Sequence, residues 1–114
     1  MQNDKAGIMA DQLIDSLAEC MKKGAKDFQT RNINEDVNNK TFVVEFVAYN
    51  YYWVGIEYEK GRITPYIIEG NRIIRLKELM NWWEELDLSK WIYQVDSEIR
   101  LRIPDKYLEA KGWK

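Results

Sequence analysis

The sequence predicts an α+β fold with helices and a mainly antiparallel sheet of about five strands. Some segments repeat apolar residues every three or four positions, which is typical of helices. Others are rich in β-branched and aromatic residues, which favour strands. The turns between the strand candidates are too short for the crossovers that parallel strands need. The expected order is α-β-β-β-α-β-β-α, in a single domain over residues 1–114.

The first helix is expected over residues 4–28, where Leu17 and Met21 belong to an apolar face with helical spacing, or it stops at Gly24, which weakens the last turns. Asp4 precedes that face and is the expected N-cap. Residues 29–40 are polar and rich in asparagine, which favours a loop. The helix is then the natural cover for one face of the sheet.

Three strands are expected next. Their residues are 41–49, 51–59 and 62–68. Asn50 is the expected turn between the first two, and Lys60-Gly61 is a two-residue hairpin signal before the third. Pro65 cannot donate to a strand ladder, so the third strand is expected to lie at an edge or to carry a bulge.

The rest of the chain is expected to form a short extended stretch over residues 72–76, a helix, a strand pair and a final helix. The middle helix is expected over residues 76–86, and the strand pair over 91–95 and 98–103. Pro104 is expected to open the last helix, which ends before Gly112.

Apolar and aromatic residues occupy both faces of the first two strands. Phe46 and Ile56 lie on one face and are expected, with Leu17, in the core. Val47 and Trp53 lie on the other face. Because one helix cannot cover both faces, either the later helices cover the second face or it binds a partner.

Composition argues against several functions. The chain has 17 basic and 19 acidic residues, net −2, without the basic excess typical of nucleic-acid binders. It has no histidine, the commonest general base and metal ligand. We therefore expect no catalytic site, cofactor or metal. With one cysteine, Cys20, and neither a secretory leader nor an apolar run of membrane length, a cytoplasmic, membrane-free protein is expected.

Two groups of side chains are candidates for binding a protein partner. The first is an acidic stripe on the first helix, made of Asp11, Asp15 and Glu19. The second joins an aromatic anchor to carboxylates and consists of Trp82, Glu84, Glu85 and Asp87. Such groups suit charge steering and a desolvated anchor, although a solvated helix face also explains the stripe.

Small size, an acidic pI, a compact α+β layout and many aromatic residues resemble the immunity proteins of bacterial toxin systems, including contact-dependent growth inhibition and polymorphic toxins. The resemblance implies a cytoplasmic protein that neutralises a cognate toxin domain, such as a nuclease, by occluding its active site or partner surface. The element order also resembles class I type III secretion chaperones, which bind an effector segment. The oligomeric state stays open.

Residues 101–112 resemble the strand–Pro–helix–Gly segment of AbrB-type transition-state regulators, which bind DNA as swapped-hairpin dimers. The sequence ends at Lys114, before the strands that follow the glycine in that family. With the acidic pI, this departure places a DNA-binding role last.

Overall fold

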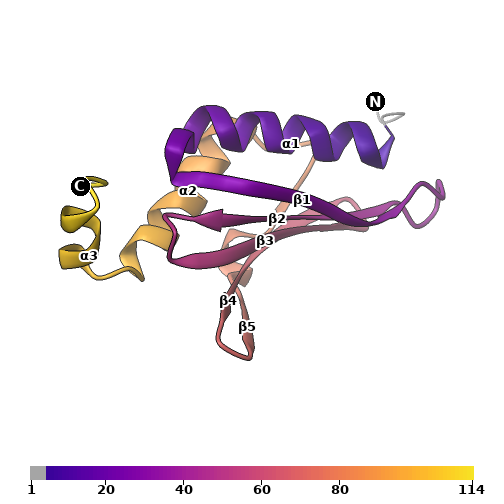
Figure 1. Ribbon diagram of the computed structural model, residues 1–114. Helices are drawn as coiled ribbons and strands as arrows, with labels where there is room; N and C mark the ends of the chain where they lie inside the picture. The colour runs from indigo at the N-terminus through magenta and orange to yellow at the C-terminus, as the bar shows by residue number, and fades with distance from the viewer. Residues whose placement is uncertain (1–4) are drawn as a thin grey trace.

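The computed structural model describes residues 5–114, which form an antiparallel sheet with helices (Figure 1). The elements are α1 (Ala6–Met21), β1 (Ala25–Asn34), β2 (Thr41–Ala48), β3 (Tyr52–Glu59), β4 (Arg62–Glu69), β5 (Arg72–Arg75), β6 (Asn81–Trp82), α2 (Leu88–Leu101) and α3 (Asp105–Ala110), with 3₁₀ turns η1 (Lys22–Gly24) and η2 (Lys77–Leu79). Strands β1 to β5 are neighbours in chain order, and β6 pairs with β4. The predicted fold class is confirmed, and the element order roughly matches.

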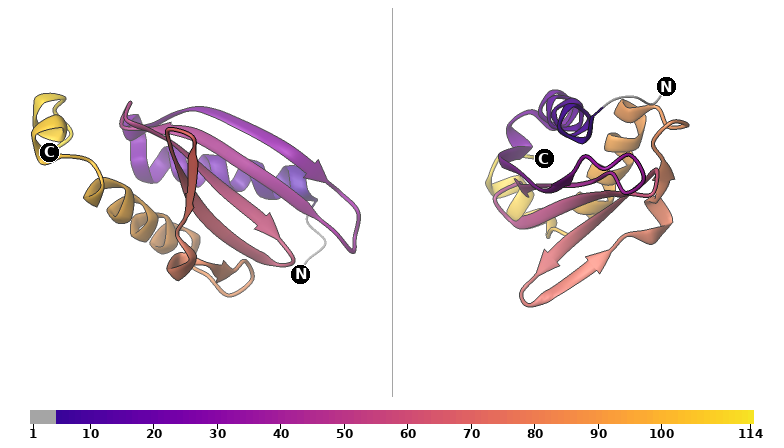
Figure 2. Two further views of the ribbon diagram at one scale, coloured as in Figure 1. Left: turned by 90° about the horizontal axis from the view of Figure 1, so that it is seen from below. Right: turned by 90° about the vertical axis from the view of Figure 1, so that its right-hand side faces the viewer.

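Helices α1 and α2 pack against each other over the same face of the sheet, as Figure 2 shows. Alternate residues of the strands point into the space beneath them and form one apolar cluster. Leu17, Phe46 and Ile56 are completely buried there, so their predicted place in the core is confirmed. Full burial of such side chains is the main favourable contribution to folding.

A carboxylate from a distant segment caps the first turn of α1. The expected cap, Asp4, lies outside the described residues, and Lys5 at the N-cap position makes no side-chain cap bond. Instead, Glu35 accepts hydrogen bonds from the backbone nitrogens of Ala6 (2.6 Å) and Gly7 (3.2 Å). These bonds lower the pKa of Glu35. The loop before β2 therefore fixes the start of the helix.

The predicted hairpins are present. The turn at Lys60-Gly61 has positive φ at both residues (54° and 81°), as a type I′ turn requires. Pro65 was expected to place its strand at an edge or in a bulge, and this expectation is wrong. Strand β4 pairs with β3 on one side and with β5 and β6 on the other. The Pro65 carbonyl accepts from the Leu76 backbone nitrogen, and the missing donor faces the gap between β5 and β6.

The prediction for residues 25–34 is wrong: they form strand β1, not the end of a helix and a loop. Helix α1 stops at Met21, and Lys22 takes a positive φ of 53°. Gly24 lies against the Tyr49 ring, where a Cβ would come within 2.7 Å, and its carbonyl accepts from the Tyr49 nitrogen. This close approach turns the chain back along β2, a long-range pairing that local spacing does not reveal.

Two later predictions are also wrong. Residues 76–86 form η2, the short strand β6 and a turn instead of a helix. Residues 91–103 belong mostly to α2 instead of a strand pair, with Asp87 accepting a hydrogen bond from the Lys90 nitrogen at its start. The buried residues of α2 recur at helical spacing, and they are Trp91, Ile92, Val95, Asp96 and Ile99. The final helix, ending before Gly112 with φ of 78°, is confirmed as α3.

Candidate functional site

The sheet face opposite α1 and α2, called the open face below, has no helix over it among residues 5–114. In the view from below, the strands lie in front of α1 (Figure 2, left). Of the two possibilities left open by the aromatic strands, the later helices therefore do not cover this face. Its central side chains come from alternate positions of the strands, namely Arg31, Val43, Glu45, Val47, Trp53, Gly55, Glu57, Thr64, Tyr66, Ile68, Ile73 and Arg75.

A tyrosine lies flat across the middle of the open face. Glu45, Gly55 and Tyr66 are direct neighbours on β2, β3 and β4. The Tyr66 ring passes over Gly55, where a Cβ would overlap the ring, and its hydroxyl donates to Glu45 Oε2. The absence of a side chain at Gly55 is what allows this reach, a common reason for glycine inside a strand.

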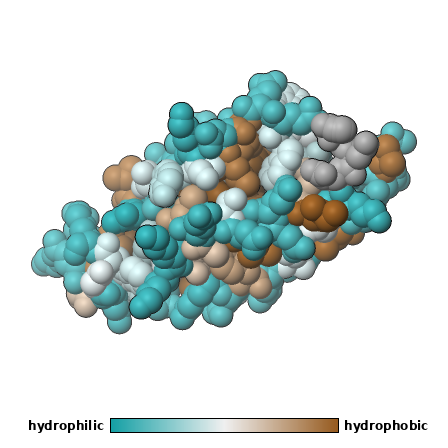
Figure 3. All heavy atoms as spheres, turned by 90° about the horizontal axis from the view of Figure 1, so that it is seen from above, coloured by the Kyte–Doolittle hydropathy of each residue, from teal (hydrophilic) through white to brown (hydrophobic). Residues whose placement is uncertain are grey.

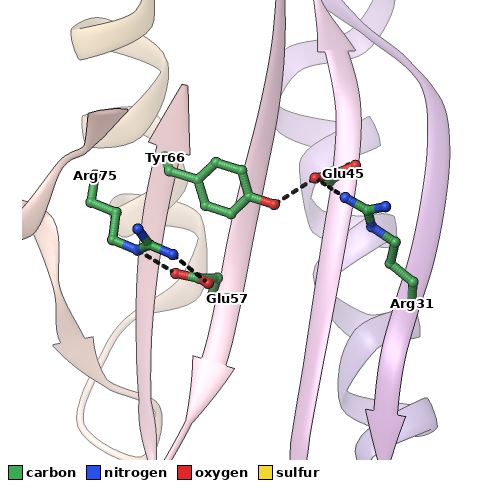
Figure 4. A network of polar contacts seen from close by, with 5 residues as sticks. All are labelled: Arg31, Glu45, Glu57, Tyr66 and Arg75. Carbon is green, nitrogen blue, oxygen red and sulfur yellow. Dashed lines mark hydrogen bonds and ion pairs between the residues drawn. The ribbon is translucent and has the colours of Figure 1, made fainter. Parts of the chain in front are cut away.

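Two arginines at the margins complete a network of polar contacts, drawn in Figure 4. Arg31 on β1 donates through Nη2 to Glu45 at 2.6 Å. Arg75 on β5 donates through Nε (2.9 Å) and Nη2 (3.1 Å) to the two oxygens of Glu57, a bidentate pair. The Arg75 guanidinium also lies 5.8 Å from the Tyr66 ring centre. The network ties five strands together without any covering helix.

The network shifts the pKa values of Tyr66 and Arg31 upward. Burial, followed by the hydrogen bond to Glu45, raises the pKa of Tyr66 to about 12. The same Glu45 carboxylate, through its hydrogen bond, raises the pKa of Arg31. Tyr66 is therefore a neutral donor and Arg31 a cation at neutral pH.

An apolar row borders the polar network. Val47, Trp53, Ile68 and Ile73 lie in register across β2, β3, β4 and β5. Trp53 keeps 39% of its surface exposed and Ile73 keeps 53%. Exposed aromatic and aliphatic side chains in a continuous row are typical of a protein-binding surface.

The second predicted patch is divided by the structure. Trp82 on β6 pairs with Arg62 and therefore lies on the open face, half exposed, with the Arg62 guanidinium 5.5 Å from its ring centre. Glu84 and Glu85 are exposed in the turn that follows. Asp87 is occupied as the N-cap of α2. Trp82 is thus the member of the patch that extends the open face.

The predicted stripe of Asp11, Asp15 and Glu19 is exposed, but it lies on the outer side of α1. The buried positions of α1, among them Leu13 and Leu17, face the sheet and α2, so the stripe points the other way. Seen from above, the surface on this side is largely hydrophilic with apolar interruptions (Figure 3). The stripe and Trp82 therefore belong to different sides of the molecule.

The edges of the sheet are poorly suited to accept an added strand. The edge strand β1 has register shifts after Lys26 and after Arg31, and Asp27 and Asn32 have positive φ. The other edge, β5, has four residues. Bulges and short edges are common devices against strand addition, so a partner would meet the face of the sheet and not its edge.

A pocket of about 570 Å³ lies beside the C-terminal end of α1. It is lined by residues from α1, η1, the β2–β3 turn, α2 and the C-terminal segment. Inside it, the Tyr49 hydroxyl donates to Asp96 Oδ1, and Arg100 lies 3.9 Å from Oδ2. Burial raises the pKa of Asp96, while the Tyr49 bond and Arg100 oppose that shift. We interpret this cluster as the contact that fixes the turn to α2.

Sequence reasoning missed the polar network, because Arg31 was expected in a loop and no contact among the side chains of the other strands was expected. Two signals for it were nevertheless present. Gly55 interrupts an otherwise apolar and aromatic strand, which indicates a close approach by another group. Glu45 sits between Val44 and Phe46, and a carboxylate in such a strand needs a partner.

Within the described part of the chain, no group of three or more acidic or cysteine side chains is placed to hold a metal ion. None of the helices there has the length and apolar character needed to cross a bilayer. Comparison with models of known protein families, with curated proteins and with solved structures found no match to this chain.

Proposed function

We propose that this chain is an immunity protein that neutralises a toxin domain by binding it through the open face. The observation that carries the proposal is the exposed row of Trp53 and Ile73, together with Trp82, on a sheet face that no described helix covers. A compact monomer gains nothing from leaving such side chains in water, whereas an interface places aromatic anchors at its centre.

The open face is also prepared for binding. Tyr66, Glu45 and Glu57 are held by hydrogen bonds, and the side chains of Arg31 and Arg75 are anchored by carboxylates. Side chains that are already ordered lose little conformational entropy when a partner docks, which favours tight binding. High affinity is what neutralisation of a toxin requires.

Among the other functions considered, the secretion chaperone has less support. Its resemblance depends on a helix over residues 76–86 and a strand pair over 91–103, where the described chain has η2, β6 and α2. A catalytic role for Glu57, a carboxylate on β3, is also less supported, because Arg75 binds both of its oxygens. A binding function remains the proposal.

The test is a growth assay with the toxin domain encoded next to the gene for this chain. That domain is expressed in a bacterial host with and without this protein. We expect growth arrest that is relieved only by co-expression, together with a complex isolated from purified components. An adjacent product that is not toxic, or a toxin that arrests growth equally in both cells, would reject the proposal.

Matched variants locate the interface in the same assay. Ile73→Thr on the open face is paired with Ile8→Thr on α1, since these side chains are 53% and 50% exposed. Trp82→Ala is paired with Tyr93→Ala on α2, at 50% and 55% exposure. We expect protection and affinity to fall with the first member of each pair and to be unchanged with the second. The reverse result would move the interface to the helices.

A further inference from the structure

We propose that the open face recognises an acidic segment of its protein partner, whose carboxylates pair with Arg31 and Arg75 while an apolar side chain packs on Trp53 and Ile73. This inference rests on the proposed function and names the chemistry of the partner. It differs from the sequence-based expectation, in which acidic residues of this chain, on the first helix or beside Trp82, contact the partner.

The outward charge of the open face differs from that of the whole chain. The net charge of the chain is −2. On the open face, however, the Arg31 side chain is 56% exposed while that of its partner Glu45 is 7% exposed. For Arg75 and Glu57 the values are 45% and 31%. An approaching molecule therefore meets more of the two guanidinium groups than of the carboxylates that hold them.

These guanidinium groups keep donors for a partner. A guanidinium has five N–H donors. The hydrogen bonds to Glu45 and Glu57 use Nη2 of Arg31, and Nε and Nη2 of Arg75. Because each arginine is already fixed in orientation, a partner carboxylate can bind at low entropic cost. The paired glutamates reduce the local charge without removing these donors.

The width of the open face sets the size of the segment. Strands β1 to β5 span four strand spacings, or ~19 Å, and Arg31 and Arg75 reach inward from the two margins to Glu45 and Glu57. The apolar row also crosses the strands, and it lies two residues along each strand from the row that contains Tyr66 and Arg75. A helix laid across the strands would need about 13 residues to span that distance. The occupant is thus a segment with an acidic side and an apolar side.

The open face combines arginines with tryptophans, but it fits a nucleic acid less well than an acidic protein segment. Phosphate binding draws its affinity from several unopposed cations. Here Glu45 and Glu57 lie directly beside Arg31 and Arg75 and would repel a phosphate backbone. A partner with a few discrete carboxylates meets less of this repulsion and gains from the apolar row, so a protein segment is favoured.

The experiment is selection from an unbiased phage-displayed library of peptides of about 13 residues, the length that spans the face. The bait is the purified parent chain, and a pool of random single-stranded oligonucleotides is tested in parallel. Enriched peptides are then measured against Arg31→Gln/Arg75→Gln, against Arg31→Lys/Arg75→Lys, and against the matched control Asp11→Asn/Asp15→Asn on α1. Thermal unfolding of each variant verifies that it is folded.

We expect the enriched peptides to combine acidic with aromatic or aliphatic residues. Their affinity should fall at least about tenfold with the glutamine pair, fall less with the lysine pair, and not change with the α1 control. Basic peptides, no enrichment, equal binding to the glutamine pair, or tighter binding of the oligonucleotides would each overturn the inference. Because no toxin is used, this result is independent of the growth assay: failure there alone rejects the immunity function, and failure here alone rejects the acidic partner.

Discussion

The two faces of the sheet are both buried at their centres, but by different means. On the face beneath α1 and α2, apolar side chains such as Phe46 and Ile56 are completely buried by the helices. On the open face, Glu45 and Tyr66 retain only 6% and 5% exposure although no described helix lies above them. There, the ring of Tyr66 and the long side chains of the arginines lie flat and cover the strands themselves.

This difference shows how one sheet can combine stability with recognition. The covered face is stabilised by the burial of apolar area, a contribution that does not depend on the direction of individual groups. The open face depends on hydrogen bonds, which fix the direction of each group and leave the arginines available on the surface. We expect changes on the covered face to act mainly on stability and changes on the margin of the open face mainly on binding.

The largest effect is expected for Phe46→Ala on the covered face. Phe46 is completely buried and contacts the Phe28 ring, 5.6 Å away between ring centres. Truncation should lower the free energy of unfolding by ~3–5 kcal/mol, from lost burial and the cavity left behind. Urea unfolding measures this value. A loss below ~1 kcal/mol would mean that the two faces do not differ in this way.

Gly55→Ala is expected to be next, because its Cβ would overlap the Tyr66 ring on the open face. The ring must move and lose its bond to Glu45, at a combined cost of ~2–4 kcal/mol. The control is the same substitution in a Tyr66→Ala background, where the overlap is absent and the additional loss should nearly disappear. Equal losses in both backgrounds would show that the ring does not lie over Gly55.

Tyr66→Phe is expected to cost ~1.5–3 kcal/mol at neutral pH, since it removes one hydrogen bond to a carboxylate. Folding raises the pKa of this hydroxyl to about 12. The contribution of the bond is therefore complete below the unfolded pKa near 10 and is lost as pH rises through the folded value. Unfolding curves of both proteins from neutral pH to about 12 should converge. A constant difference would contradict the assignment.

The smallest effect on stability is expected for Ile73→Thr at the margin of the open face. Ile73 is 53% exposed and threonine keeps the β-branched shape, so the free energy of unfolding should change by no more than ~0.5 kcal/mol. Thermal unfolding and binding are measured on the same sample. A large loss of stability would indicate that the apolar row supports the fold and is not reserved for a partner.

The strands from Thr41 to Arg75 could be predicted because their signals are local. The Lys60-Gly61 turn adopts the φ values that these residues tolerate, and the flanking strands alternate as required. Residues 25–34 and 91–103 could not be predicted in the same way. Residues 25–34 acquire their strand conformation by pairing with β2. Residues 91–103 combine a helical apolar face with an alternation of aliphatic residues and arginines at 99–103, and that alternation also suits a strand.

The sequence alone determined the fold class, the antiparallel hairpins, the core positions of Leu17, Phe46 and Ile56, and the final helix, because short-range turn preferences and apolar periodicity specify each of them. The tertiary structure decided which face stays uncovered and which groups meet there. The residues that meet there come from five different strands, and they are Arg31, Glu45, Gly55, Tyr66 and Arg75. Their contacts depend on the strand register and on the packing of α1 and α2 against the opposite face. Such long-range pairings leave almost no local signal in the sequence, since each residue taken alone is equally compatible with a solvated strand.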